Sequence, residues 1–401
     1  IRKLRLLIMF KKLFKDFYRI LSTPIEGFLL LESASTILLF LCTILALFLA
    51  NSHLKEEYFL ILNKNVLGLS VLHWINDALM SFFFFVVGME IKREIREGEL
   101  ATLKKASLPI VAAIGGMIVP ALFYFSLNTS GIQSHGWGIP MATDIAFAVA
   151  ILSIAGKRVP LSLKVFLLAL AIVDDLGAVL VIALFYTKGI SWEYLGFASL
   201  ALIAIALLKR WRETSFFYYV PLAVAVWAAF LFSGVHATIA GVILGFMIPV
   251  NFVNKQNQAI RPVDNCIHKL HPIVSFVIMP LFALSNAGVT LELRNMLAIL
   301  NHSIFQGIVL GLVLGKTLGI FGACFLAVRL GVSSLPGKVT WKEIFGVSAL
   351  GGIGFTMSLF ISSLAFEYDP ELFSKAGILA GSLIAGILGW GFLRFIYREN
   401  K

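Results

Sequence analysis

Long apolar stretches separated by short polar connections make up almost the whole chain. A helix that spans a membrane needs about 20 mostly apolar residues, and fewer where it is broken. We count twelve such stretches, near residues 28–50, 74–90, 107–127, 138–155, 163–187, 192–208, 216–233, 236–250, 272–291, 304–328, 343–366 and 373–396. No connection is long enough to form a second globular domain. The pattern predicts an all-α polytopic membrane protein with twelve transmembrane helices.

Two of these stretches are short and contain helix-breaking residues. In the stretch 138–155, Pro140 removes a backbone donor and disfavours helical geometry before it. The stretch 343–366 holds three glycines within four positions, Gly351, Gly352 and Gly354. A simple kink at the proline and close helix packing at the glycines are the plain alternatives.

The two interrupted stretches occupy matching thirds of two three-span units, residues 107–187 and 304–396. Paired interruptions in corresponding halves of a transporter point to a binding site at the middle of the bilayer. We therefore expect two discontinuous helices whose free carbonyls and half-helix ends coordinate a small ion.

Composition and charge give the chain an orientation. Hydrophobic residues make up 59% of the 401 residues, more than a soluble protein of this length could bury in one core. Of the 33 Lys and Arg residues, 27 lie in the N-terminal segment, in every second connection after it and at the C-terminus, and five lie on the opposite side. By the positive-inside rule both termini are cytoplasmic. The net charge of +11 therefore belongs to the membrane surface and requires no nucleic-acid partner.

The first 22 residues mix basic residues with bulky apolar ones at helical spacing. This pattern predicts an amphipathic helix on an anionic membrane surface, with a solvated basic tail as the alternative. We assign residues 1–22 to this cytoplasmic segment and residues 23–401 to a single twelve-helix transport domain.

Few ionisable groups remain at membrane depth once the connections are removed: Asp77, Glu90, Asp144, Asp174, Asp175, His236 and Lys316. The deepest are Asp144, the adjacent aspartates and Lys316, which would together cost on the order of 10 kcal/mol if left unpaired. They must therefore face one another or a water-filled cavity.

Asp174 and Asp175 are neighbours on one predicted helix, so their side chains point about 100° apart. One of them can turn toward Lys316 while the other faces water. A purely architectural ion pair with Lys316 is the alternative, but it leaves the other aspartate and Asp144 unexplained. Three carboxylates against one lysine indicate a cation site. Asp144, in the first broken span, is placed to compensate the positive N-terminal end of a half helix.

At these residues the chain resembles the NhaA family of bacterial sodium/proton antiporters. The resemblance covers nearly everything after residue 25 and rests on an ordered set of segments: "WINDALMSFFFFVVGMEIKREI" (74–95), "AAIGGMIVPAL" (112–122), "ATDIAFA" (142–148), "LAIVDDLGAVLVIALFYT" (170–187), "SGVHATIAGVILGF" (233–246), "PLFALSNAGV" (280–289), "GKTLGI" (315–320) and "GIGFTMSLFISSLAF" (352–366).

The resemblance implies inverted-topology repeats with two discontinuous helices that cross near the bilayer midplane. It makes Asp175 the main carrier of the ion and the proton, and Asp174 its neighbour, paired with Lys316 in some states. Asp144 would balance the broken-helix ends with Thr143 beside it. His236, Glu90 and Glu94 would belong to the family's cytoplasmic pH-responsive region or its surroundings. For His236 alone, a hydrogen-bonded histidine at a helix end is the favoured interpretation.

The chain departs from the family pattern in two places. Ile267, in "NCIHKLHP" (265–272), stands where the family commonly has an acid, so the pH dependence is expected to differ. The connection from Asn51 to His73 is shorter than the family's extracellular hairpin, which contributes to dimer contacts, so we expect a homodimer that is held weakly.

The expected activity is export of Na⁺ and Li⁺ from the cytoplasm in exchange for external protons, electrogenic and pH-regulated, in the bacterial inner membrane. Such a protein is a secondary transporter with no cofactor.

Three other classes of protein fit these residues less well. An intramembrane aspartyl protease would need its two aspartates on separate helices, whereas Asp174 and Asp175 are consecutive. A carrier of an organic anion would need more cationic groups than Lys316, and a channel would need a repeated ring of carbonyl or acidic residues.

Overall fold

Helices make up most of the chain in the computed structural model, which describes residues 24–156, 159–187, 189–211, 215–253, 258–290, 296–366 and 369–399. The predicted amphipathic segment 1–22 lies outside the described residues. Seven spans are long and apolar enough to cross a membrane. They are α4–η1–α5 (Val71–His73, Trp74–Leu79, Met80–Glu97), α6 (Leu103–Leu127), α8 (Leu161–Phe185), α9 (Trp192–Arg210), α12–η3–α13 (Pro262–Ile273, Val274–Ile278, Met279–Asn286), α15–η5–α16 (Ser303–Leu310, Gly311–Gly315, Lys316–Arg329) and α19 (Asp369–Glu399).

Three more spans consist of helix pairs that bend sharply at a short break. The bend is 112° between α2 (Pro24–Ala50) and α3 (Lys55–Asn63), 42° between the 3₁₀ helix η2 (Ile132–Met141) and α7 (Ile145–Ala155), and 45° between α17 (Trp341–Leu350) and α18 (Phe355–Ala365). Two shorter apolar helices, α10 (Phe216–Ser233) and α11 (Ala237–Met247), complete the set. All twelve predicted spans are therefore present as helices.

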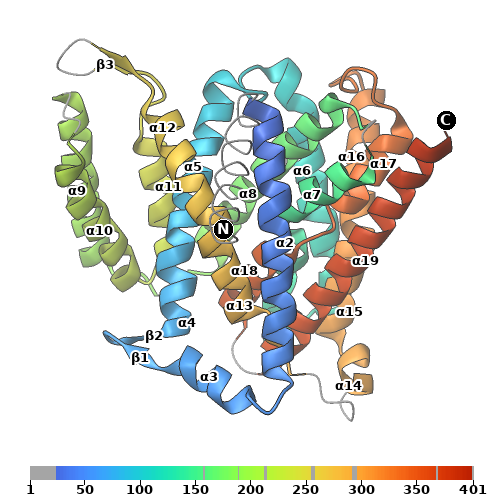
Figure 1. The fold of residues 1–401 in the computed structure, drawn as a ribbon, viewed down its shortest axis with the longest axis horizontal. Helices are drawn as coiled ribbons and strands as arrows, with labels where there is room; N and C mark the ends of the chain where they lie inside the picture. The colour runs from blue at the N-terminus through green and yellow to red at the C-terminus, as the bar shows by residue number, and fades with distance from the viewer. Residues whose placement is uncertain are drawn as a thin grey trace, which may run out of the picture.

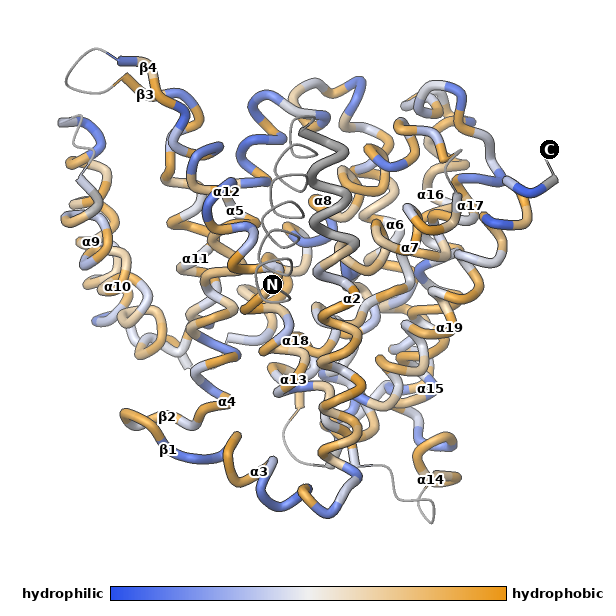
Figure 2. The backbone as a smooth tube through the Cα atoms, in the orientation of Figure 1, coloured by the Kyte–Doolittle hydropathy of each residue, from blue (hydrophilic) through white to orange (hydrophobic). Residues whose placement is uncertain are grey.

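The molecule has two polar ends, which we call the upper and lower faces as drawn in Figure 1. The upper face carries the hairpin of β3 (Phe252–Val253) and β4 (Ala259–Ile260) and the C-terminal end of α19. The lower face carries α3, the hairpin of β1 (Asn65–Val66) and β2 (Leu69–Ser70), and α14 (Met296–Asn301). Figure 2 shows hydrophilic segments gathered at these two ends and hydrophobic residues along the helices between them. That distribution matches a chain that crosses a bilayer.

The two predicted three-span units share one order of elements, a long helix, a broken helix and a second long helix. The units meet where α6 packs against α16. A Cβ atom added at Gly115 would lie 2.4 Å from the Gly319 carbonyl oxygen, and one added at Gly319 would lie 2.3 Å from the Gly115 carbonyl oxygen. Glycine at both positions therefore lets the two backbones touch, as small residues do between membrane helices.

Several elements differ from the sequence-based expectation. The first break follows Met141 and not Pro140, because the 3₁₀ helix η2 tolerates the proline and ends one residue later. The span predicted at 272–291 begins earlier, at Pro262, since the polar residues of α12 extend the helix beyond its apolar part. The π-helical turns η1, η3 and η5 and the two short hairpins had no sequence signal that we used.

Candidate ion-binding site

The two broken spans cross at their breaks. The Asp144 N–H donates to the Ile353 carbonyl oxygen at 2.6 Å. The Thr143 hydroxyl donates to the Gly351 carbonyl oxygen at 2.8 Å, and the Ser358 hydroxyl donates to the Ile139 carbonyl oxygen at 2.8 Å. Each broken span thus gives one hydroxyl to a carbonyl at the free C-terminal end of the other. The predicted meeting of the two interruptions is confirmed.

The glycines of the second break allow close packing, and they are not in left-handed conformations. Gly351 has φ −57° and Gly354 has φ −89°, both in the right-handed region. A Cβ atom added at Gly352 would lie 2.3 Å from the Leu312 carbonyl oxygen, which belongs to the π-helical turn η5. The break therefore requires glycine because a neighbouring backbone occupies the space of a side chain.

Asp144 serves both half helices at the crossing. One carboxylate oxygen, Oδ1, accepts the Phe147 N–H at 3.1 Å and so caps its own helix α7. The other, Oδ2, accepts the Thr356 N–H at 3.1 Å and also the Thr356 hydroxyl, at the start of α18. A carboxylate at a helix N-terminus offsets the positive end of the helix dipole. One buried charge here offsets two such ends.

The adjacent aspartates of α8 have different surroundings. Lys316 Nζ donates to Asp174 Oδ2 at 2.7 Å, and the two side chains are only 1% and 2% exposed. Lys316 is the first residue of α16, directly after the π-helical turn η5. A π turn adds one residue to the helix and so redirects the side chains that follow, which is common at functional sites. Thr143 also lies beside Asp174.

Asp175 is buried and lines a cavity, and within the described part of the chain its carboxylate makes no hydrogen bond. The prediction that one aspartate turns to Lys316 while the other faces a cavity is confirmed. Asp174 is the paired residue and Asp175 the one that faces the cavity.

The cavity lies between α2, α5, α7, α8, α12–α13 and α18 and has a volume of about 70 Å³. That volume leaves room for a small cation with water, since about 10–15 Å³ of such space already holds one water molecule. Its polar lining consists of oxygen-bearing side chains and one histidine: Ser35, Glu90, Asp144, Asp175, Ser275, Thr356 and His271. Oxygen ligands of this kind suit hard cations.

Three aromatic rings pack together next to the cavity. Phe84, Phe282 and Phe360 are fully buried, and the Phe360 ring centroid lies 5.4 Å from that of Phe84 and 6.3 Å from that of Phe282. Each ring lies within four residues of a cavity-lining residue on its own helix, which is Phe83 on α5, Met279 on α13 and Thr356 on α18. We call Phe84, Phe282 and Phe360 the aromatic cluster.

The three residues expected to respond to pH lie in different places. Glu90 lines the cavity on its upper side, and its Oε1 lies 3.9 Å from His271 Nε2. Glu94 lies further up α5, where its carboxylate accepts the Glu99 N–H at 3.0 Å. Glu90 and His271 are therefore the pair next to the ion cavity.

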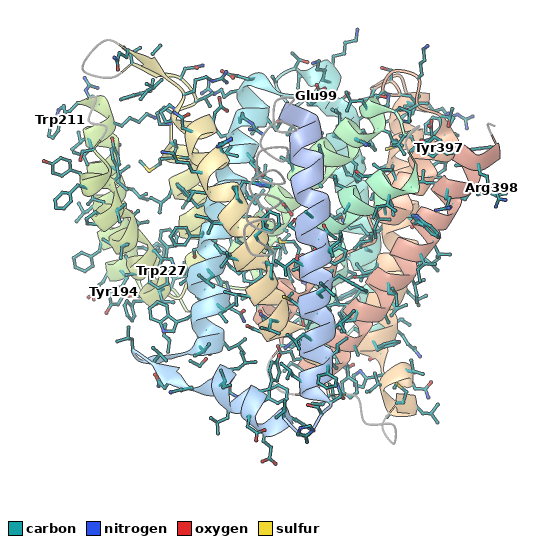
Figure 3. The ribbon with its side chains drawn as sticks, viewed as in Figure 1. Glu99, Tyr194, Trp211, Trp227, Tyr397 and Arg398 are labelled. Atoms are coloured by element: carbon teal, nitrogen blue, oxygen red, sulfur yellow. The ribbon has the colours of Figure 1, made fainter. Side chains whose placement is uncertain are left out.

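His236 does not belong with those glutamates. It precedes α11, and its Nε2 lies 2.8 Å from the Tyr186 carbonyl oxygen. Figure 3 shows Trp211, before α10, at the upper end and Trp227, within α10, near the lower end, so the chain reaches His236 at the lower side. The interpretation of His236 as a hydrogen-bonded histidine at a helix end is confirmed, and its role in the pH response stays a prediction.

Four polar residues of the cavity lining were missed from the sequence: Ser35, His271, Ser275 and Thr356. Thr356 lies just after the broken-helix glycines, in a segment that we quoted, but no local pattern shows that its hydroxyl meets Asp144 from 212 positions away. His271 lies in the "NCIHKLHP" segment, where we considered only the substitution at Ile267. The proximity of His271 to Glu90 arises from the packing of α12 against α5.

Comparison with known proteins now identifies this arrangement. The family model described as Na+/H+ antiporter 1 matches residues 26–393. The chain belongs to that family. Among similar antiporters, NhaA 1 of Clostridium beijerinckii is 45% identical over 390 residues, covering 95% of this chain and 97% of that protein. NhaA of Vibrio parahaemolyticus is 48% identical over 375 residues, covering 92% and 97%. As a member of the Na+/H+ antiporter 1 family, the protein is a secondary transporter that exchanges Na⁺ for protons, and not an enzyme.

Proposed function

We propose that the exchange takes place at Asp175, whose carboxylate binds either Na⁺ or a proton and never both. The support is the contrast between neighbours: Lys316 neutralises Asp174, whereas Asp175 faces the cavity without a hydrogen-bond partner in the described residues. No group of three or more His, Cys, Asp and Glu side chains in the described residues could hold a metal ion. Sodium would be held by Asp175 together with neutral oxygens, such as carbonyls, hydroxyls and water, with Asp174 as the neighbouring carboxylate expected from the sequence.

The proposal includes alternating access. The cavity is lined by Glu90 and His271, and the aromatic cluster lies next to it. Rocking of the two three-span units, taken as residues 107–187 and 304–396, would open the site to one face at a time. The excess of basic residues at the ends of alternate connections supports a cytoplasmic upper face in the bacterial inner membrane. Protons from outside would then displace Na⁺ bound from the cytoplasm.

We also propose that exchange is electrogenic, accepts Li⁺ and is regulated by pH. A second titrating group, Asp174 or Lys316, would move more protons than sodium ions in each cycle. Glu90 and His271 are the groups placed to respond to cytoplasmic pH, because they lie 3.9 Å apart at the cavity. A homodimer stays a prediction from the family resemblance.

Proton flux in everted membrane vesicles tests the assignment of Asp175. With an acidic interior, added Na⁺ or Li⁺ should release protons from vesicles that contain the wild-type protein, and K⁺ should not. Asp175→Asn should abolish this response, because the amide binds neither a proton nor a cation in the required way. Glu56→Gln, which removes an exposed carboxylate on α3, is the matched control and should behave as wild type. Sodium-driven proton release by Asp175→Asn would refute the assignment.

A further inference from the structure

The last helix, α19, lies against both halves of the second broken span. Small residues recur at every fourth position on one face of this helix: Gly377, Gly381, Ala385 and Gly389. A Cβ atom added at Gly352 would lie 3.0 Å from the Ala385 Cβ, and one added at Gly389 would lie 2.6 Å from Leu350 Cδ2. The small face thus lets α19 approach the backbone of the break closely.

Ser382 lies beside this face and reaches the exposed end of α18. Its hydroxyl oxygen accepts the Gly354 N–H at 3.2 Å and the Phe355 N–H at 3.1 Å, and the residue is 7% exposed. The N-cap of α18 is Gly354, which has no side chain to accept these donors. The first N–H groups of a helix have no partner within the helix, so acceptors must come from elsewhere.

Ser382 and Asp144 together provide those acceptors. Ser382 takes the N–H groups of the first two positions, and Asp144 Oδ2 takes that of Thr356, the next position. The location of the first turn of α18 therefore depends on both residues. Thr356 lines the same cavity as Asp175, so any displacement of this turn changes the polar lining around the carboxylate.

We propose that Ser382 is a positioning residue for ion exchange, a role that rests on the function proposed above. Its hydroxyl fixes the start of α18 so that Thr356 meets Asp144 and the positive end of α18 is neutralised away from the cavity. Without Ser382, two buried N–H groups lose their acceptor, and the positive end of α18 is held by Asp144 alone. Cation binding at the cavity is then weakened, whereas the rocking of the two units is not directly affected.

The structure contains a matched control on the same helix. Ser374 is a fully buried serine of α19 whose hydroxyl is hydrogen-bonded to that of Ser362, near the other end of α18. It ties the same two helices together but lies away from the crossing and from the cavity lining. Ser374→Ala therefore removes one buried hydroxyl, its α18–α19 hydrogen bond and its bond to the Glu371 carbonyl oxygen within α19, without touching the first turn of α18.

The test is Na⁺-dependent exchange in proteoliposomes of known protein content, measured over a range of Na⁺ concentrations and pH. Ser382→Ala should raise the Na⁺ KM by about three- to tenfold and displace the pH profile, with less than a twofold change in kcat at saturating Na⁺. Ser382→Thr, which keeps the hydroxyl, should restore both. Ser374→Ala should keep the wild-type KM and pH profile.

Two results would overturn the proposal. One is a wild-type KM and pH profile in Ser382→Ala, and the other is an equal change in Ser374→Ala, which would indicate packing alone. If Ser382→Ala does not reach the membrane, Ser382→Cys supplies the test, because the slightly larger thiol still fills the position and is a weaker acceptor; an unchanged KM there also overturns the proposal. Failure of the proposed function is distinct, since Asp175→Asn would then exchange Na⁺ in the same liposomes.

Discussion

The half helices that follow the two breaks, α7 and α18, obtain acceptors for their first N–H groups in different ways. The first break supplies its own cap, because Asp144 is the N-cap of α7 and its side chain accepts the Phe147 N–H. The second break has Gly354 at the corresponding position and takes its acceptors from Asp144 and Ser382, which lie on other spans. The second half helix therefore holds its place only when the first span and α19 are in position. Because Asp144 serves both, the two breaks act as one unit.

Asp144→Asn separates the two roles of this side chain and should have the largest effect. The amide oxygen can still cap α7, but the amide group would present donors to the Thr356 N–H and hydroxyl. A buried donor without an acceptor costs about 1–3 kcal/mol, and the second positive helix end loses its counter-charge. We expect Na⁺/H⁺ exchange in vesicles to fall on the order of 100-fold.

Thr356→Val sharpens this result, since it removes only the hydroxyl that donates to Asp144. Its loss of exchange should be clearly smaller than that of Asp144→Asn. Equal losses in the two variants would mean that Asp144 does not act through both helix ends.

Gly352→Ala tests whether the second break depends on close packing. The added methyl group would meet the Leu312 carbonyl oxygen, and a backbone atom in a packed interior cannot move aside cheaply. We expect the free energy of unfolding to fall by about 1–3 kcal/mol, measured as a lower thermal midpoint of the purified protein in detergent. Gly196→Ala is the control, because a Cβ atom at that position of α9 meets nothing within 4 Å. A midpoint of Gly352→Ala equal to that of Gly196→Ala would show that the break tolerates a side chain.

Thr143→Val removes the hydroxyl that the first span gives to the second, and it should have the smallest effect. The Gly351 carbonyl oxygen loses a donor at 2.8 Å, and a buried hydrogen bond contributes about 1 kcal/mol. We expect the exchange rate to fall about fivefold, and Thr143→Ser to keep the wild-type rate. A rate of Thr143→Val equal to that of wild type would show that this bond does not hold the crossing together.

Much of the fold follows from the sequence, because a bilayer imposes a simple rule on every span. Hydropathy located all twelve spans, and the interruptions at Pro140 and at the glycines marked two of the three helix pairs that bend sharply; the bend between α2 and α3 was not predicted. The position of the first break differed slightly, since a 3₁₀ helix accommodates Pro140 and ends at Met141. Local residue patterns can reveal a weak point in a helix, but the conformation there depends on what the half helix packs against.

From the residues alone, only the charged members of the site were predictable, and Thr143 was added by the family resemblance. Asp144, Asp174, Asp175 and Lys316 were visible because charge at membrane depth is costly. Thr356, His271 and Ser382 were not, since hydroxyl and imidazole groups in a span carry little penalty and their partners lie far away in the sequence. The resemblance supplied a role for His236 without a position, and that role stays a prediction.

Sodium binding to purified protein, measured by titration calorimetry between about pH 9 and pH 6, tests the central claim most directly. If one carboxylate takes either a proton or Na⁺, the two compete. As the pH is lowered through the range in which Asp175 is mostly protonated, the apparent Na⁺ affinity should fall by about tenfold for each pH unit. Asp175→Asn should show no binding heat at any pH. A Na⁺ affinity that stays constant across this range, or Na⁺ binding by Asp175→Asn equal to that of wild type, would contradict the account.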